Sequence, residues 1–233
     1  MSGQDIQISG PDGDFSGYLA LPAQTPAPAV VLLQEIFGVN ADMRAKCDAL
    51  AKEGYVAFCP DLFWRIEPGI QLTDKTEAEW ARAFELFNAF NVDNGMKDID
   101  ASIEAIRGHE ACSGKVGTIG YCLGGQLAYL SATRTGSDAS VGYYGVAIAN
   151  RLDEAKSISK PLMLHIAGKD EFVPADQQAA MHEGLDDHPM TQLHDYPDMD
   201  HAFARTDGTH YDRDNAVLAD GRTMSFLAQH LRF

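Results

Sequence analysis

The segment Gly120-Tyr-Cys-Leu-Gly124 places a cysteine between two glycines, directly after the predicted strand Lys115–Ile119. In this setting small residues let a strand and the following helix approach closely, while the central residue occupies a strained turn with an exposed side chain, as in a nucleophile elbow. The start of a helix also directs N–H groups and the positive end of its dipole toward the sulfur, which favours a thiolate. Taken alone, the pattern equally fits a buried Cys122 in a tight glycine turn.

A cysteine nucleophile requires a base and a group that orients the base. Asp170 follows the predicted strand Leu162–Ile166, and His201 follows the predicted strand Thr191–Tyr196. The order Cys122, Asp170, His201 is the nucleophile, acid and histidine order of α/β-hydrolases, with each residue at the carboxyl end of a different strand. This agreement favours the nucleophile over the buried cysteine.

The other histidines have ordinary structural explanations. His165 and His194 fall inside predicted strands, which indicates structural roles. Polar or helical contexts indicate surface positions for His182, His188, His210 and His230. An alternative is a metal cluster formed by His194, Asp195, Asp198, Asp200 and His201. These residues lack a recognised ligand spacing and resemble a solvated loop, so we expect neither a metal nor an organic cofactor.

Apolar runs between turn residues predict eight strands. These are Ile6–Ser9, Phe15–Leu21, Ala29–Leu33, Val56–Cys59, Lys115–Ile119, Ser140–Tyr144, Leu162–Ile166 and Thr191–Tyr196. Apolar residues at helical spacing predict six helices. These are Asn40–Glu53, Glu77–Phe90, Met96–Arg107, Leu123–Ala132, Ala175–Glu183 and Asn215–His230. Gly54 is a candidate C′ glycine that ends the first helix.

Strands such as Ala29–Leu33 are apolar throughout, which is typical of a parallel sheet covered by helices on both faces. The sequence therefore predicts an α/β fold with a doubly wound, mostly parallel sheet of about eight strands. We expect a single domain over residues 1–233, because no segment resembles an interdomain linker. The stretch Trp64–Lys75, with Pro68 and Gly69, is predicted to be one long surface loop.

Composition excludes several classes of function. The formal net charge of −16 argues against nucleic-acid binding, which needs clustered Lys and Arg. The sequence contains neither a signal-peptide pattern nor an apolar run long enough to span a bilayer, so we expect a cytoplasmic protein without a membrane partner. Four scattered cysteines without CxxC spacing indicate reduced thiols.

Several segments together resemble the dienelactone hydrolases, an α/β-hydrolase family that uses cysteine in place of serine. The resemblance extends over most of the chain. It rests on Gln34-Glu-Ile-Phe-Gly-Val-Asn40, Gly54-Tyr-Val-Ala-Phe-Cys-Pro-Asp-Leu62, Gly117-Thr-Ile-Gly-Tyr-Cys-Leu-Gly-Gly125, Val141-Gly-Tyr-Tyr-Gly145 and His201-Ala-Phe-Ala-Arg205.

The resemblance implies roles for particular residues. Cys122, Asp170 and His201 would form the triad, and Glu35 would be the family's additional carboxylate, which takes the thiol proton when an anionic substrate arrives. The N–H groups of Ile36 and Leu123 would form the oxyanion hole. In the remaining pocket Phe37 and Tyr144, which lie in two of the matching segments, are candidate substrate contacts.

Substrate binding is where the sequence departs from the family. Members that act on dienelactone hold the substrate carboxylate with two arginines. Arg205 matches the first, but the second position is Trp80, and a tyrosine expected on the same helix is Phe84. Arg82 faces about 200° away from position 80 on a helix and is a poor replacement. Trp80 and Phe84 therefore indicate a more apolar substrate, whereas Trp80, Phe84 and Phe87 together fit equally well an ordinary core-facing stripe of the helix.

We therefore expect hydrolysis of a small carboxylic ester or lactone, neutral or anionic, through a thioester on Cys122, by a monomer or small homo-oligomer. Two other classes of function remain open. An activated Cys122 could serve a redox sensor, for which Cys59 is a candidate resolving thiol if it lies nearby in space. The chain could also be a hydrolase scaffold retained as a binding module.

Overall fold

The computed structural model describes residues 3–232, and within them all eight predicted strands are present. They belong to one sheet in the order β1-β2-β4-β3-β5-β6-β7-β8, which confirms the predicted α/β class. The strands are β1 (Gln4–Gly10), β2 (Gly13–Ala20), β3 (Ala27–Leu33), β4 (Val56–Pro60), β5 (Cys112–Tyr121), β6 (Ser140–Tyr143), β7 (Leu162–Ala167) and β8 (Thr191–Tyr196).

The six predicted helices are also present, with shifts at their ends. They are α1 (Ala41–Lys52), α2 (Glu77–Ala89), α3 (Val92–Arg107), α4 (Leu123–Arg134), α5 (Ala175–Leu185) and α6 (Arg213–Leu231). Gly54, with φ +88°, lies just past α1 as predicted. The sequence analysis missed the 3-10 helix η1 (Ile148–Ser157).

The helix α3 begins four residues before its predicted start at Met96. Val92-Asp-Asn-Gly95 has the composition of a turn, but the Asn91 side chain caps the helix by accepting the Asn94 N–H. Gly95 lies within the helix, and a Cβ at this position would lie 2.3 Å from the Phe90 ring, so a larger residue would clash. The packing of Phe90 therefore explains a glycine that resembled a helix stop.

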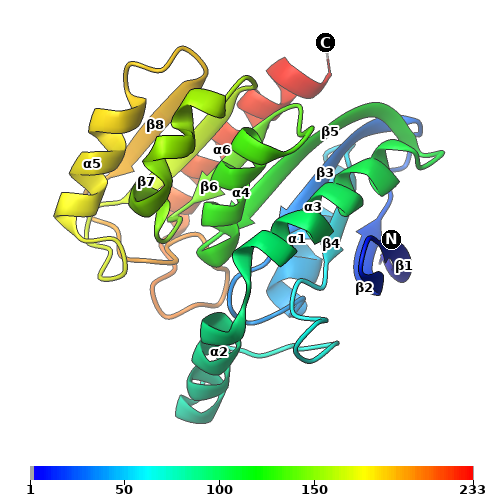
Figure 1. Ribbon diagram of the computed structural model, residues 1–233, viewed down its shortest axis with the longest axis horizontal. Coiled ribbons are helices and arrows are strands. Elements are labelled where there is room, and N and C mark those ends of the chain that lie inside the picture. Colours follow the sequence, from blue (N-terminus) through cyan, green and yellow to red (C-terminus); the bar gives the residue numbers. More distant parts are fainter. Residues whose placement is uncertain (1–2, 233) are drawn as a thin grey trace. The chain divides into compact units, whose positions relative to one another are not determined.

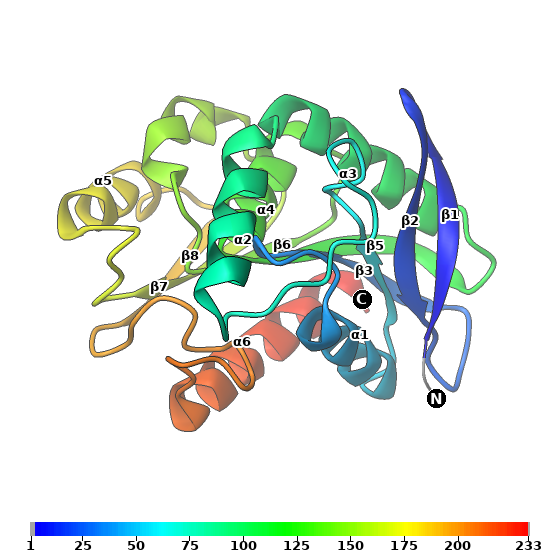
Figure 2. The same ribbon diagram turned by 90° about the horizontal axis from the view of Figure 1, so that it is seen from below.

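The chain divides into two compact units, one ending at Thr118 and the other beginning at Ile119. This boundary lies inside β5 rather than in a linker, and a single domain remains a prediction. In the first unit β2 is antiparallel to both β1 and β4, whereas β3 and β4 are parallel. Helices α1 and α3 cover opposite faces of these strands, and α2 extends away from them (Figures 1 and 2).

In the second unit β6, β7 and β8 are parallel neighbours. Helices α4 and α6 lie on opposite faces of these strands (Figure 2). Parallel strands place their carboxyl ends at one edge, so the turns after β6, β7 and β8 emerge together. None of the helices within residues 3–232 has the length and apolar character needed to cross a bilayer.

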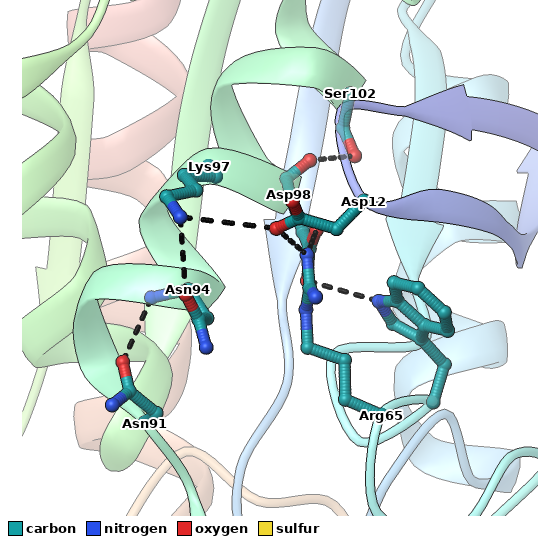
Figure 3. Close-up of polar contacts among 8 residues, drawn as sticks. Asp12, Arg65, Asn91, Asn94, Lys97, Asp98 and Ser102 are labelled. Atoms are coloured by element: carbon teal, nitrogen blue, oxygen red, sulfur yellow. Dashed lines mark hydrogen bonds and ion pairs between the residues drawn. The ribbon is translucent and has the colours of Figure 1, made fainter.

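A buried ion pair holds the loop that precedes α2. The Arg65 guanidinium donates to both Asp98 carboxylate oxygens at 2.9 and 2.8 Å, and the Trp64 indole N–H donates to Asp98 at 2.9 Å. Arg65 also pairs with Asp12 at the surface (Figure 3). The prediction that this stretch is a surface loop throughout is wrong in part, because Ile70 is buried and Gln71 bridges to Gly38 in the turn after β3.

We expect Asp98→Ala to lower the free energy of unfolding by about 2 kcal/mol or more, because it leaves the Trp64 N–H and the partly buried Arg65 guanidinium without their buried acceptor. The Asp98 side chain is fully buried, whereas that of Asp12 is 41% exposed. Asp12→Ala is therefore the matched control, with an expected loss of at most about 1 kcal/mol. Urea denaturation of both variants checks this; equal losses would contradict the role assigned to the buried contact.

Candidate active site

Cys122 occupies a strained turn between β5 and α4. Its φ of 57° and ψ of −114° lie outside the regions that non-glycine residues ordinarily adopt. The turn requires glycine nearby, because a Cβ on Gly120 would lie 1.8 Å from the Gly124 carbonyl oxygen. A Cβ on Gly125 would lie 2.6 Å from the Tyr143 carbonyl oxygen. The Gly-x-Cys-x-Gly pattern therefore has the geometry of a nucleophile elbow.

The backbone of the elbow is tied to the end of β6. The Cys122 N–H donates to the Tyr143 carbonyl at 3.1 Å, and the Val146 N–H donates to the Cys122 carbonyl at 3.4 Å. Leu123 is the first residue of α4. The first N–H groups of a helix have no acceptor within the helix, so the Leu123 N–H is suited to bind developing negative charge.

Asp170 and His201 are brought together from the turns after β7 and β8. The Asp170 Oδ2 lies 2.7 Å from the His201 Nδ1, and both side chains are buried. The other carboxylate oxygen, Oδ1, accepts the Phe172 N–H at 2.8 Å. Each oxygen of Asp170 thus has a defined partner, which sets the orientation of the imidazole ring.

The electrostatics of His201 link it to Cys122. Burial alone would lower the pKa of His201, but the negative charge of Cys122 and the hydrogen bond to Asp170 outweigh burial and raise the pKa to about 10. The His201 Nε2 is buried and makes no hydrogen bond of ordinary geometry within residues 3–232. The effect of Cys122 on the pKa of the ring therefore acts chiefly through charge.

This raised pKa predicts how stability depends on pH. A group whose folded pKa exceeds its unfolded value near 6.5 stabilises the fold fully below that value, and the contribution is lost as pH rises through about 10. We expect unfolding free energy to fall with pH in this window, by at most about 1.4 kcal/mol per pH unit. Denaturation at several pH values should give a shallower slope for His201→Gln and Cys122→Ala; unchanged slopes would contradict the assignment.

Two aromatic rings enclose the His201 imidazole. Tyr144, a predicted substrate contact, is buried with φ 37°, and its ring lies edge-on to His201 at a centroid distance of 5.0 Å. Phe172 contacts His201 at 4.9 Å and is 39% exposed. Phe172 was not among the predicted site residues, although its position two residues after Asp170 was a usable signal.

The loop after His201 is held by its own backbone and by a second histidine. His210 is exposed as predicted, and its Nδ1 lies 3.2 Å from the His201 carbonyl oxygen. Arg205, the predicted carboxylate ligand, is buried in this loop at 7% exposure, and its N–H donates to the Ala202 carbonyl at 2.9 Å. The loop thus places a buried guanidinium four residues after His201.

The remaining predicted site residues lie in the first unit. Glu35, Ile36 and Phe37 lie in the turn after β3, one residue beyond its end, and are all buried. Gln34 braces this turn, because its amide accepts the Leu62 N–H at 3.0 Å and donates to the Glu35 carbonyl at 3.4 Å. The turn therefore has a fixed backbone, as an oxyanion-hole donor at Ile36 requires.

Trp80 and Phe84 form an aromatic group with Phe37. The Trp80 indole meets Phe37 edge-on at 5.1 Å and stacks with Phe84 at 5.6 Å. Its N–H donates to the Asp74 carbonyl at 3.1 Å. Arg82, the one basic residue of α2, pairs instead with Glu67 and Glu85. The side chains of α2 at positions 80 and 84 therefore form an apolar group with Phe37 within the first unit.

Three of the five residues in the alternative metal cluster have other partners. His201 bonds to Asp170, Asp195 to His182, and Asp198 to Lys169. Within residues 3–232 no group of three or more His, Cys, Asp or Glu is arranged to hold a metal ion.

Cys59, the candidate resolving thiol, is fully buried in the first unit. It forms a side-chain hydrogen bond with Cys47, where burial raises the pKa of the Cys47 thiol well above its ordinary value. Both side chains are shielded from solvent, so this pair lacks the exposure typical of redox-sensing cysteines.

Comparison with known proteins gives one consistent family. The model of the dienelactone hydrolase family matches residues 15–231. A "putative carboxymethylenebutenolidase" of Azospirillum brasilense is 48% identical over 233 residues, covering 97% of this chain and 99% of that protein. The carboxymethylenebutenolidase of Pseudomonas putida is 41% identical over 226 residues, covering 97% and 96%. The crystal structure of a "putative dienelactone hydrolase" of Klebsiella pneumoniae has a TM-score of 0.86 at 25% identity, covering 98% of this chain and all of that one.

Proposed function

The chain belongs to the dienelactone hydrolase family, and on this basis we propose that it hydrolyses small carboxylic esters or lactones through a thioester on Cys122. The observation that carries the proposal is the nucleophile-elbow backbone of Cys122 together with the Asp170–His201 hydrogen bond of 2.7 Å. The acidic composition, with a net charge of −16, agrees with a small-molecule substrate rather than nucleic acid.

In the first half-reaction the Cys122 thiolate attacks the ester carbonyl carbon. The carbonyl oxygen becomes an oxyanion, which the N–H groups of Leu123 and Ile36 are proposed to bind; each such donor contributes roughly 3 kcal/mol. When the tetrahedral adduct collapses, the carbon–oxygen bond breaks and protonated His201 gives its proton to the leaving alkoxide. The products of this step are a thioester and neutral His201.

In the second half-reaction His201 must act as a base. The thioester sulfur carries no charge, so the main cause of the raised pKa of His201 is absent at this stage. The neutral imidazole takes a proton from water, water attacks the thioester, and the Cys122 thiolate is expelled. Asp170 stabilises the imidazolium that forms again. The charge of Cys122 thus switches His201 between acid and base.

As the resemblance to the family implies, Glu35 is proposed to take the thiol proton of Cys122 when substrate arrives, which generates the thiolate that attacks. The proton returns from Glu35 to the sulfur when the product leaves, so that the cycle balances. The position of Glu35 in the turn after β3 and its 3% exposure support this role. We would compare alkylation of Cys122 by iodoacetamide in the wild type and in Glu35→Gln, with and without a substrate analogue. Analogue-stimulated alkylation that persists in Glu35→Gln would overturn the assignment.

The proposed substrate is a more apolar ester or lactone than dienelactone. Support comes from the aromatic group of Phe37, Trp80 and Phe84, and from the pairing of Arg82 with Glu67 and Glu85. Trp80 cannot make the bidentate, charge-assisted contact that a substrate carboxylate requires. Arg205 would then be the principal reader of a carboxylate or carbonyl group.

A substrate panel tests both levels of the proposal. We would measure p-nitrophenyl acetate, cis- and trans-dienelactone and several neutral lactones, with Trp80→Arg and the matched control Arg82→Gln. We expect Trp80→Arg to raise the ratio of kcat/KM for anionic over neutral lactones by about tenfold, and Arg82→Gln to leave the ranking unchanged. Wild-type turnover of dienelactone with kcat/KM near or above about 10⁶ M⁻¹s⁻¹ would refute the apolar preference.

A further inference from the structure

His165 lies at the centre of a buried hydrogen-bond chain in the second unit. Its ring is 1% exposed, with Nδ1 2.8 Å from the Tyr196 hydroxyl and Nε2 2.9 Å from the Thr223 hydroxyl. The chain continues on each side until it reaches a charged residue of α6. Its remaining bonds are Thr223 Oγ1 to Tyr143 Oη at 2.6 Å, Tyr143 Oη to Asp220 Oδ1 at 2.9 Å, and Arg222 Nη1 to Tyr196 Oη at 3.1 Å.

Counting protons fixes the direction of every bond. The carboxylate of Asp220 only accepts, so the single Tyr143 hydroxyl proton is donated to it. Tyr143 must then accept from Thr223, whose hydroxyl also has one proton. Thr223 in turn must accept from His165, which places the ring proton on Nε2.

The other end of the chain has the matching polarity. Arg222 only donates, and it donates to the Tyr196 hydroxyl. The proton of Tyr196 then points to Nδ1 of His165, which carries a lone pair in the neutral Nε2–H tautomer. Burial lowers the pKa of His165 well below its usual value, and the nearby His194 and Arg222 lower it further. A neutral His165 therefore completes an unbroken chain from a cation to an anion.

The same three strand residues also hold the catalytic turns through their backbone carbonyls. The Tyr143 carbonyl accepts the Cys122 N–H at 3.1 Å, and the His165 carbonyl accepts the Tyr144 N–H at 2.8 Å. The Tyr196 carbonyl accepts two N–H groups, at 2.9 and 3.0 Å, from Gly168 and Met199, which begin the turns to Asp170 and His201. Each of these three residues thus takes part in the hydrogen-bond chain through its side chain and holds a turn of the site through its backbone carbonyl.

Helix α6 lies on the face of β6, β7 and β8 opposite α4 (Figure 2). Its residues Asp220, Arg222 and Thr223 connect the three strands from that face. The Tyr196 ring also packs against Phe203 at 4.7 Å, and Phe203 packs against Tyr144 at 5.6 Å. The hydrogen-bond chain is therefore linked, through Tyr196 and Phe203, to the aromatic ring of Tyr144 beside His201.

We propose that His165, held as the neutral Nε2–H tautomer by this chain, is a positioning residue that sets the relative placement of Cys122, Asp170 and His201. It does not touch the reacting atoms, and it acts through the strand ends. Misplacement of reacting groups by about 1 Å can cost about 10²-fold in rate. The inference rests on the proposed function of the triad, but the state of His165 can be measured without any substrate.

The decisive variant is Thr223→Val, which removes the central hydroxyl while keeping the shape of the side chain; Thr223→Ser is the conservative rescue. We would record kcat and KM with p-nitrophenyl acetate and the ¹⁵N shifts of His165, assigned by comparison with His165→Gln. We expect Thr223→Val to lower kcat by about tenfold or more with KM changed by less than about twofold. Its His165 should lose the Nε2–H preference, and Thr223→Ser should restore both properties.

A second pair of variants tests the Asp220 end of the hydrogen-bond chain, which lies at the surface. Asp220→Ala removes the terminal acceptor, and Asp214→Ala removes the same charge from the first turn of the same helix, outside the chain. We expect only Asp220→Ala to lower kcat and change the His165 shifts. Both residues are exposed, so both variants should fold even if Thr223→Val does not.

The outcomes separate the two levels of inference. Failure of the wild type to hydrolyse any ester would contradict the proposed function and leave the tautomer of His165 as an independent result. The positioning role would be overturned by a different result. In that result the wild type is active and the His165 tautomer is lost in Thr223→Val and Asp220→Ala, but both variants keep a kcat within about twofold of the wild-type value. A His165 ring that carries protons on both nitrogens at neutral pH, or its single proton on Nδ1, would contradict the assigned directions of the hydrogen bonds.

Discussion

Cys122→Ala is expected to lower kcat for ester hydrolysis by about 10⁶-fold, the loss that removing the nucleophile of a serine triad produces. The reason is that the proposed mechanism forms its covalent bond on this sulfur, and alanine offers no replacement. The strained backbone of the elbow does not depend on the sulfur, because the Cys122 N–H donates to the Tyr143 carbonyl and the Cys122 carbonyl accepts the Val146 N–H. The variant should therefore fold as the wild type does.

The matched control for this variant is Cys112→Ala. Cys112 is the least buried of the other three free thiols and lies at the start of β5, away from the elbow. We expect it to retain wild-type kcat on p-nitrophenyl acetate, and mass spectrometry should trap an acyl group on Cys122 only. Activity of Cys122→Ala within about 100-fold of wild type would exclude the thioester mechanism.

Asp170→Asn should have the second largest effect, a loss of about 10⁴-fold in kcat like that of the same change in a serine triad. The Phe172 N–H donates to the Asp170 Oδ1 at 2.8 Å and would hold the amide oxygen of asparagine there. The amide NH₂ must then face the His201 Nδ1, which can only accept. This forces the ring proton onto Nε2, the wrong tautomer for a base.

The pH profile of Asp170→Asn provides a second signature. The hydrogen bond to Asp170 is one cause of the raised pKa of His201, so its loss should lower that pKa and move the limb of the kcat/KM profile assigned to His201 toward acid. Glu171→Gln removes an exposed charge at the next position and serves as the control. Retention of more than about a tenth of wild-type kcat by Asp170→Asn would show that Asp170 does not orient His201.

Much of the architecture could be predicted from the sequence because apolar runs and turn residues are local signals. Strands such as β3 are buried on both faces, so they read as uninterrupted apolar segments. The 3-10 helix η1 was missed because its segment is mostly polar, with two buried residues, Ile148 and Ala155. The start of α3 was missed because Gly95 resembles a stop, and only the Phe90 ring explains it.

By itself the sequence determined the α/β class and the chain order of Cys122, Asp170 and His201, since both depend on residue type and local spacing. The departure at Trp80 follows only from the resemblance to the family. Only the tertiary structure decided that Phe172 and Tyr144 enclose His201 and that His165 joins three strands to α6. The partners of His165 lie 31 and 58 residues away along the chain. Contacts over such separations depend on strand register and helix packing, which no local pattern encodes.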